Sequence, residues 1–368
     1  MRSNIIELVN NHSLYRRRCL NLVPSENVLS KSAMRALICD LAQRYHHEDF
    51  YGGTKYANQI IELTRDLLSE LYRAEFVFVE PLSGNIAFLS ALLSLTKPKD
   101  KVAIIHPEEG GYPFNFNPIN RIPVYLLMDF ENGTVDIEKS KEIIQKEKPK
   151  LIVLGASFIM FPHPVKELSE IGEDVGALTV YDGSHVLGLI AGNKFQDPLR
   201  EGAVALLGST HKTFPGPQGG IILTNDDDVA KKLSEVITFP PVLVDNIHLN
   251  RVAALGITAE EMLRYGAEYA AKIVENAQFL AKALHSNGLN VMYKEKGFTM
   301  SHQIWYKVRS ENEGYRIKTL LERARIIVDA GVRFGTQEVT RLGISEEDLK
   351  RIAEVVYRIL ILHEEPSK

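Results

Sequence analysis

Cysteine is scarce in this chain, since Cys19 and Cys39 are the only two among 368 residues. No disulfide framework or thiolate metal site can therefore be read from the sequence. No apolar run approaches the roughly 20 residues that cross a bilayer, and residues 1–20 mix charges into their apolar stretch, unlike a signal peptide. The formal net charge of -4 predicts neither nucleic acid nor an anionic membrane as partner. We expect a cytoplasmic protein.

The composition is that of an ordinary globular protein, with 45% hydrophobic and 24% charged residues. The length allows a large core and predicts one large domain with a smaller companion. From residue 57 to residue 224, short apolar runs typical of strands alternate with stretches of helical periodicity, such as 57–72. This alternation predicts an α/β fold with a large, mostly parallel sheet and helices on both faces.

The pattern changes beyond residue 224. A long helical stretch ends at Gly288, a suitable helix C-cap, and strand-like segments at 289–295 and 302–308 precede further helices. We read this part as a small α+β domain. The predicted organisation is an N-terminal helical arm over 1–25, a large domain over 26–256, and a linking helix with the small C-terminal domain over 257–368.

Two polar motifs in the large domain follow expected strands. Ser83, Gly84 and Asn85 would begin a helix, where free N–H groups and the helix dipole favour a phosphate; taken alone, a plain strand-to-helix turn is the better interpretation. Asp182 ends a buried strand, where open α/β sheets bind ligands. Its carboxylate is costly to desolvate unless a cation faces it, although a capping or turn aspartate fits this position equally well.

The third motif is "STHKTFPGPQGG", residues 209–220, which lies between two apolar runs. A lysine in a partly apolar pocket at a sheet edge can have a lowered pKa and form a Schiff base. The alternative is an exposed lysine in a β-turn. Prolines and glycines fix such a turn, but they do not explain the polar Ser209, Thr210 and His211 that precede Lys212.

Together the three motifs supply what pyridoxal phosphate needs: a phosphate cradle, an acid for the pyridinium nitrogen and a lysine for the aldehyde. Their order along the chain suits a fold that brings strand ends to one crevice. The coincidence of the three is far more specific than any one of them.

The chain resembles the serine hydroxymethyltransferase family, within fold type I of the pyridoxal-phosphate enzymes. The resemblance covers nearly the whole chain in family order, and its strongest matches are "STHKTFPGPQGG" and "GVRFGT". The motifs that carry it are "LVPSENVLS", "YGGTKY", "PLSGNIAF", "VYDGSHVLGLIAG", "STHKTFPGPQGG" and "AGVRFGTQEVTRLG".

This resemblance implies roles for the residues of the large domain. Lys212 would form the Schiff base with the cofactor, Asp182 would pair with the pyridinium nitrogen, and His185 would sit beside the ring. The remaining cofactor-binding residues would be Ser83, Gly84, Asn85, Tyr112, Ser157, Ser209 and His211.

The resemblance also implies how an amino-acid substrate is held. Arg333 matches an arginine that grips the substrate carboxylate, a role that suits the fork of a guanidinium. Ser25 would reach the same end of the substrate, and Tyr45 matches a family tyrosine. Tyr51 would come from the partner subunit, which implies a homodimer with shared active sites.

Several positions depart from the family pattern. "EGGY" places Tyr112 where the family has a histidine over the cofactor ring. The family's catalytic glutamate aligns with His47, so we expect Glu48, one position away, to be the acid or base. The "HHED" cluster at 46–49 is better explained as solvated side chains than as a metal site. "FPPVLVDN" (239–246) lacks the glycines that reach a partner's phosphate, and "LLERARIIVDA" (320–330) leaves little room for a pterin-side loop.

The leading hypothesis is cleavage of a β-hydroxy amino acid such as serine, with transfer of the one-carbon unit to a tetrahydropterin co-substrate. A pterin-independent aldolase, racemase or transaminase is the alternative within enzymes. A non-catalytic homologue that serves as a binding subunit is a third possibility, and the retention of Lys212, Asp182, His185 and Arg333 argues against it.

Overall fold

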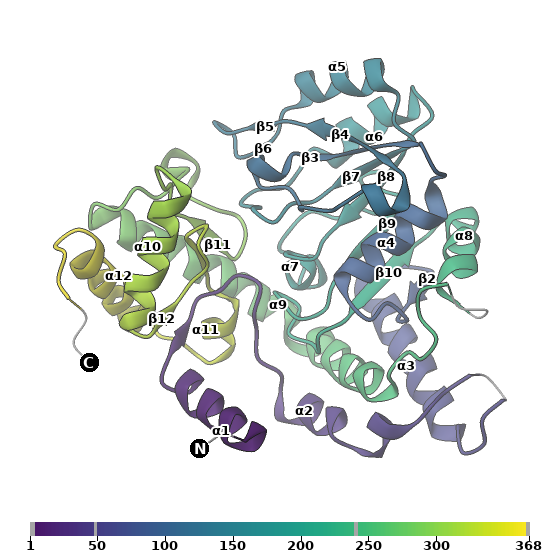
Figure 1. Ribbon diagram of the computed structural model, residues 1–368, viewed down its shortest axis with the longest axis horizontal. Helices are drawn as coiled ribbons and strands as arrows, with labels where there is room; N and C mark the ends of the chain where they lie inside the picture. Colours follow the sequence, from purple (N-terminus) through teal and green to yellow (C-terminus); the bar gives the residue numbers. More distant parts are fainter. Residues whose placement is uncertain (1–3, 48–49, 239–241, 366–368) are drawn as a thin grey trace. The chain divides into compact units, whose positions relative to one another are not determined.

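The computed structural model describes residues 4–47, 50–238 and 242–365. The chain divides into two compact units (Figure 1). The large unit comprises residues 27–271, and the small unit comprises residues 1–26 together with 272–368. This division falls within one long helix, and it groups the N-terminal segment with the C-terminal part of the chain. The sequence-based domain boundaries of 1–25, 26–256 and 257–368 remain a prediction about folding domains.

The large unit is built on a seven-stranded sheet with the strand order β2-β10-β9-β8-β7-β3-β4. Strand β10 is antiparallel to both of its neighbours, β2 and β9, whereas β9, β8, β7, β3 and β4 form parallel pairs. The mostly parallel sheet predicted from the sequence is therefore confirmed. The strands are β2 (Phe76–Phe78), β3 (Lys101–Ile105), β4 (Ile122–Leu126), β7 (Leu151–Leu154), β8 (Leu178–Asp182), β9 (Ala205–Ser209) and β10 (Gly220–Thr224).

Helices cover both faces of this sheet. Alternate residues of a strand point to opposite faces, so each strand can contact both layers of helices. Leu151 and Val153 of β7 share a buried core with residues of α4 (Gly84–Leu95) and α8 (Asp227–Ile237). Ile152 points the other way, since a Cβ at Gly172 of α6 would meet its Cδ1 atom. α5 (Ile137–Glu147) packs against α6 (Val165–Glu173) (Figure 1). Burial on both faces explains why β7 is apolar throughout.

The remaining elements of the large unit connect these layers. They are α2 (Lys31–Leu37), α3 (Lys55–Tyr72), the short strands β5 (Met128–Asp129) and β6 (Thr134–Val135), α7 (Leu187–Ala191), and 3₁₀ turns at 40–43, 107–109 and 117–119. The helix expected over 57–72 corresponds to α3. The long helix α9 (Leu249–Ser286) ends as predicted, because Gly288 has a φ of 89° and its N–H donates to the carbonyl of His285.

The small unit has its own apolar core and two short pairs of strands. β1 (Leu20–Asn21) is parallel to β12 (Ile326–Ile327), and β11 (Gln303–Trp305) is antiparallel to β13 (Arg333–Gly335). Its core contains Leu22 of the N-terminal segment alongside residues from the end of α9 and from later helices. These helices are α1 (Ile5–Arg16), α10 (Glu311–Arg323), α11 (Gln337–Arg341) and α12 (Glu346–Leu360), with a 3₁₀ turn at 294–296.

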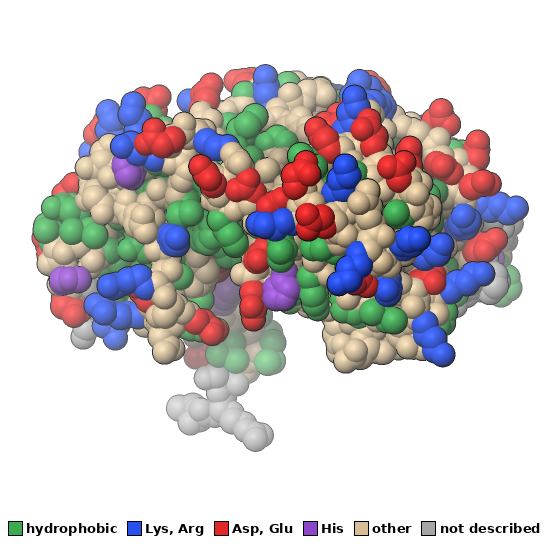
Figure 2. Space-filling model, turned by 90° about the horizontal axis from the view of Figure 1, so that it is seen from above, with side chains coloured by type: hydrophobic (Ala, Val, Ile, Leu, Met, Phe, Trp, Pro, Cys, Tyr) green, Lys and Arg blue, Asp and Glu red, His purple; other side chains and the backbone are tan. Residues whose placement is uncertain are grey.

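Within the described part of the chain, no helix has the length and apolar character needed to cross a membrane. On the face drawn in Figure 2, basic and acidic side chains are interspersed rather than gathered by sign.

Candidate active site

The carboxyl ends of five strands of the large unit meet at one cavity of about 260 Å³. The segments after β2, β3, β7, β8 and β9 each contribute to its lining, as expected of an open α/β sheet. Every residue that the sequence assigns to the cofactor lies here. The lining comprises Ser83, Gly84, Asn85, Tyr112, Gly155, Ala156, Ser157, Asp182, Ser184, His185, Ser209, His211 and Lys212.

Lys212 lies in the loop between the antiparallel strands β9 and β10, and hydrogen bonds fix both sides of this loop. The hydroxyl of Thr210 donates to the carbonyl of Pro217 at 2.6 Å, which closes the turn from inside. The hydroxyl of Thr213 donates to the carbonyl of His185 at 2.7 Å. The small polar residues around the lysine therefore satisfy buried backbone groups and tie its loop to the end of β8.

Asp182 stands at the end of β8, where its Oδ1 accepts the N–H of Ser184 at 2.9 Å. Burial raises the pKa of Asp182, whereas hydrogen bonds from Ser184 and the charge of Lys212 lower it. The net shift is upward, so the contacts of the chain itself do not fully offset the cost of burying this carboxylate. A cation against Asp182 would favour its ionised form.

The N-terminus of α4 faces the same cavity. Ser83 caps the helix, because its hydroxyl accepts the N–H of Ile86 at 3.1 Å. Gly84 cannot be replaced by a larger residue without movement, since a Cβ there would overlap the hydroxyl of Ser209. This close approach brings the hydroxyl of Ser209 next to the first turn of the helix, where backbone N–H groups favour an anion such as a phosphate.

His211 and Tyr112 complete the walls. Burial, with a smaller contribution from the charge of Lys212, lowers the pKa of His211 to about 4, and its buried Nδ1 has no hydrogen-bond partner among the described residues. The hydroxyl of Tyr112 donates to Oδ1 of Asn85 at 2.9 Å. Burial and the charge of Asp182 raise the pKa of Tyr112, so this phenol stays protonated at neutral pH.

These features fit pyridoxal phosphate. The cradle at Gly84 suits a phosphate, the buried Asp182 carboxylate suits a pyridinium nitrogen, and Lys212 is the amine for an aldehyde. The unpartnered Nδ1 of His211 adds a polar atom available to a ligand.

The lining of the cavity does not include the other residues that the sequence predicts for the site. Tyr45 and Tyr51 pack together with ring centroids 5.8 Å apart, and neither lines the cavity. Glu48 lies outside the described residues. Ser25 and Arg333 belong to the small unit. There the guanidinium of Arg333 pairs with the carboxylate of Asp329, whose Oδ2 accepts from Nη2 at 2.8 Å and from Nε at 3.0 Å.

Two polar residues at the site were not predicted. Asn27 donates from Nδ2 to the backbone carbonyl of Lys212 at 2.6 Å and to the hydroxyl of Tyr269 at 3.0 Å, so it anchors the lysine loop. Its signal was the asparagine of the "SEN" motif. Ser184 accepts from the backbone N–H of Ser209 at 3.0 Å, which links β8 to β9. The sequence feature that could have indicated Ser184 is its position between Asp182 and His185.

The "HHED" segment, residues 46–49, lies only in part within the described residues. Among the described residues, no group of three or more His, Cys, Asp or Glu side chains is arranged to hold an ion. His46 contacts Asn58, with its Nε2 2.8 Å from Oδ1.

His163 supports the cavity wall from a buried position. Its Nδ1 accepts the N–H of the lining residue Gly155 at 3.3 Å, and its ring stands edge-on to Tyr181. The side chain is 3% exposed, and burial lowers the pKa of His163 from 6.5 to about 4. Protonation would turn the accepting nitrogen into a donor and would break the bond to Gly155.

His163 should therefore make folding pH-dependent. Because its folded pKa lies below the unfolded value, its contribution is complete above pH 6.5 and is lost as the pH falls towards 4. We expect a free energy of unfolding about 2 kcal/mol lower at pH 5 than at pH 7 from this group. Urea unfolding at both pH values measures it. His163→Asn keeps an acceptor without titrating, so an unchanged pH dependence in that variant would contradict the assignment.

The mostly parallel sheet, the strand ends that meet at the cavity and the lysine loop are those of a fold type I pyridoxal-phosphate enzyme. A crystal structure of L-threonine transaldolase from Pseudomonas fluorescens in the internal aldimine state superposes with a TM-score of 0.89 and 25% identity, over 98% of this chain and 88% of that one.

The particular family is shown by two further comparisons. The family model of serine hydroxymethyltransferase matches residues 1–356. The serine hydroxymethyltransferase of Pyrococcus horikoshii is 39% identical over all of this chain and 92% of its own length, and that of Methanothermobacter thermautotrophicus is 40% identical over 97% and 89%. The chain therefore belongs to the serine hydroxymethyltransferase family, and the resemblance inferred from its motifs is confirmed.

Proposed function

We propose that this protein converts serine to glycine by cleaving the Cα–Cβ bond and passes the one-carbon unit to a tetrahydropterin. Family membership supports the reaction class. The observation that carries the proposal is the single cavity in which Lys212, Asp182, His185 and the N-terminus of α4 lie together.

When bound there, pyridoxal phosphate supplies an electron sink for the electron pair left on Cα. The N–H groups at Ser83 and Gly84, with Ser209 and His211, would hold its phosphate. Asp182 would face the pyridinium nitrogen and keep it protonated. Lys212 would bind the aldehyde carbon covalently through Nζ.

The ring would be bounded by His185 and Tyr112, and Ser157 would hydrogen-bond its phenolic oxygen. Tyr112 stands where the family has a histidine, and its pKa is raised, so it can orient the ring but cannot take a proton at neutral pH. The hydroxyl proton of serine would therefore be moved by another group. We assign that role to Glu48, with Tyr51 and Tyr45 at the same end of the substrate.

The substrate carboxylate would bind to the guanidinium of Arg333, assisted by the hydroxyl of Ser25. The pairing of Arg333 with Asp329 supports this assignment, because it holds the guanidinium in a fixed orientation.

A pterin-independent aldolase is the second candidate. The likeness to an L-threonine transaldolase favours it, as does the short segment 320–330 on the expected pterin side. The two functions differ in whether the fragment leaves as a free aldehyde or on a carrier.

The experiment is to load the protein with pyridoxal phosphate and to follow glycine formation from serine with and without a tetrahydropterin. Glycine formation that depends on the pterin supports the proposal. Equal turnover of serine or threonine without it, with release of free aldehyde, would favour the aldolase. Absence of both reactions in protein that binds the cofactor would refute both functions.

We also propose that the protein works as a cytoplasmic homodimer. The supporting observation is that α1 has no buried residue and exposes Ile5, Ile6 and Val9, which are 74%, 74% and 57% accessible. A second copy of the chain would bury these exposed apolar side chains. Light scattering should give about twice the chain mass of 41.4 kDa, and a monomer at micromolar concentration would refute this.

A further inference from the structure

Ser25 lies in a tight turn of the small unit that has no regular secondary structure. The turn is closed by the N–H of Glu26, which donates to the carbonyl of Val23 at 3.2 Å. Pro24 is buried, whereas Ser25 is half-buried. A residue that binds substrate from such a turn needs the turn itself to be fixed, because a shift of 1 Å is enough to weaken binding or catalysis.

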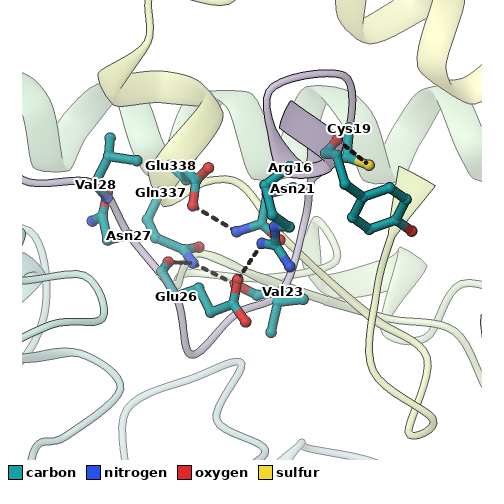
Figure 3. A network of polar contacts seen from close by, with 10 residues as sticks. Arg16, Cys19, Asn21, Val23, Glu26, Asn27, Val28, Gln337 and Glu338 are labelled. Carbon is teal, nitrogen blue, oxygen red and sulfur yellow. Dashed lines mark hydrogen bonds and ion pairs between the residues drawn. The ribbon is translucent and has the colours of Figure 1, made fainter. Parts of the chain in front are cut away.

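The amide of Gln337 holds both ends of this turn. Its Nε2 donates to the carbonyl of Val23 at 2.8 Å and to the carbonyl of Glu26 at 2.6 Å (Figure 3). The side chain is fully buried, at 0% exposure. The amide of Gln337 therefore donates to the two backbone carbonyls that flank Pro24 and Ser25.

Two further contacts fix the turn: Nε2 of His302 lies 3.1 Å from the carbonyl oxygen of Pro24, and the segment that carries Arg333 binds the residue just before the turn. The N–H of Gly335 donates to the carbonyl of Leu22 at 2.7 Å. A Cβ at Gly335 would lie 2.6 Å from Cα of Pro24, so the two segments touch backbone to backbone. Ser25 is thus held against the same strand that begins with Arg333.

We propose that Gln337 is a positioning residue for the amino-acid substrate: it holds the hydroxyl of Ser25 in register with the guanidinium of Arg333. The inference rests on the proposed function, in which these two groups bind the substrate carboxylate. Gln337 itself touches neither substrate nor cofactor in this scheme. It acts through the turn, and α11 places it four residues after Arg333 on a continuous stretch of chain.

Other contacts of the N-terminal segment should keep the protein folded when Gln337 is replaced, so the effect of Gln337 on the turn can be measured by itself. Arg16 pairs with Glu26 at 2.6 Å, and Asn21 donates to Glu338 at 2.5 Å (Figure 3). β1 also pairs with β12 on the N-terminal side of the turn. These contacts keep the segment attached when Gln337 is changed, so we expect the turn to loosen without detachment of the N-terminal segment.

The test compares Gln337→Met with Asn276→Leu. Asn276 is a matched control, because it is 2% exposed, lies in the same unit, and donates from its amide to Thr340 of the same helix α11. Gln337→Met should raise KM for serine about tenfold with kcat within about twofold, and Asn276→Leu should leave KM unchanged. Both variants are also made in a Ser25→Ala background.

Hydrogen exchange of the peptide covering residues 22–27, measured by mass spectrometry on unloaded protein, gives a readout that does not need activity. Faster exchange in Gln337→Met, together with a rise in KM that vanishes in the Ser25→Ala background, supports the proposal. Faster exchange with unchanged KM overturns it, and so does an equal rise in KM for Asn276→Leu. If loaded wild-type protein binds no amino acid at all, the proposed function itself fails.

Discussion

Replacing Lys212 with alanine should remove the covalent attachment of pyridoxal phosphate and lower turnover by roughly 10²–10⁴-fold. The amine stands in a loop whose shape does not depend on its side chain, because Asn27 binds the backbone carbonyl of Lys212 and Thr213 binds that of His185. The variant should therefore fold and keep the cavity. The measurement is borohydride reduction of loaded protein followed by peptide mass spectrometry, together with kcat for serine.

Lys212→Arg is the matched variant for this test. It keeps a cation that interacts with Asp182, but a guanidinium is a poor nucleophile for an aldehyde. Both variants should therefore lose the reduced cofactor adduct, and only Lys212→Ala should change the electrostatics of the cavity. A cofactor mass found on another lysine, or retained turnover in Lys212→Ala, would contradict the assignment.

Much of the fold of the large unit could be predicted from the short apolar runs in the sequence and from the helical segments that separate them. Leu151–Leu154 and Ala205–Ser209 are buried throughout, and runs of this kind separated by helices predict parallel strands covered on both faces. The antiparallel direction of β10 has no signal in the run itself. It follows from the tight loop around Lys212, which is too short for the crossover that a parallel pair needs.

The small unit was harder to predict. Residues 289–295 were expected to form a strand, but only Val291 pairs, in an isolated bridge with Tyr306. Tyr293 has a φ of 62°, and the chain turns into a 3₁₀ segment at Lys294. Apolar alternation over a few residues cannot reveal such a turn. Likewise, the pairing of β1 with β12 is two residues long, so periodicity gives no hint that the N-terminal segment joins the C-terminal unit.

The composition of the cavity was predictable because its residues follow strand ends. Once a parallel sheet is inferred, the positions after β7, β8 and β9 must share one edge, whatever the lengths of the connecting helices. Contacts between side chains were not predictable. That Ser184 would bind Ser209, or that Asp329 would pair with Arg333, depends on rotamers and strand register, which the pattern of apolar residues does not determine.

Replacing Asp182 with asparagine should lower kcat by about 10²- to 5 × 10³-fold, because an amide cannot keep the pyridinium nitrogen charged. The basis is the loss of one partner of a buried ion pair, worth about 3–5 kcal/mol. Asparagine keeps an oxygen for the N–H of Ser184, which donates to Asp182 at 2.9 Å, so the turn at the end of β8 should persist. The measurements are kcat and the dissociation constant of pyridoxal phosphate.

Asp174→Asn provides the control for this change. Asp174 is exposed at the end of α6 in the same unit, so the substitution alters the net charge equally without touching the cavity, and kcat should stay within about twofold. A cofactor methylated on its ring nitrogen carries a permanent charge and should recover part of the lost rate in Asp182→Asn. Equal losses in Asp182→Asn and Asp174→Asn would show that net charge, rather than the contact with the ring nitrogen, governs the rate.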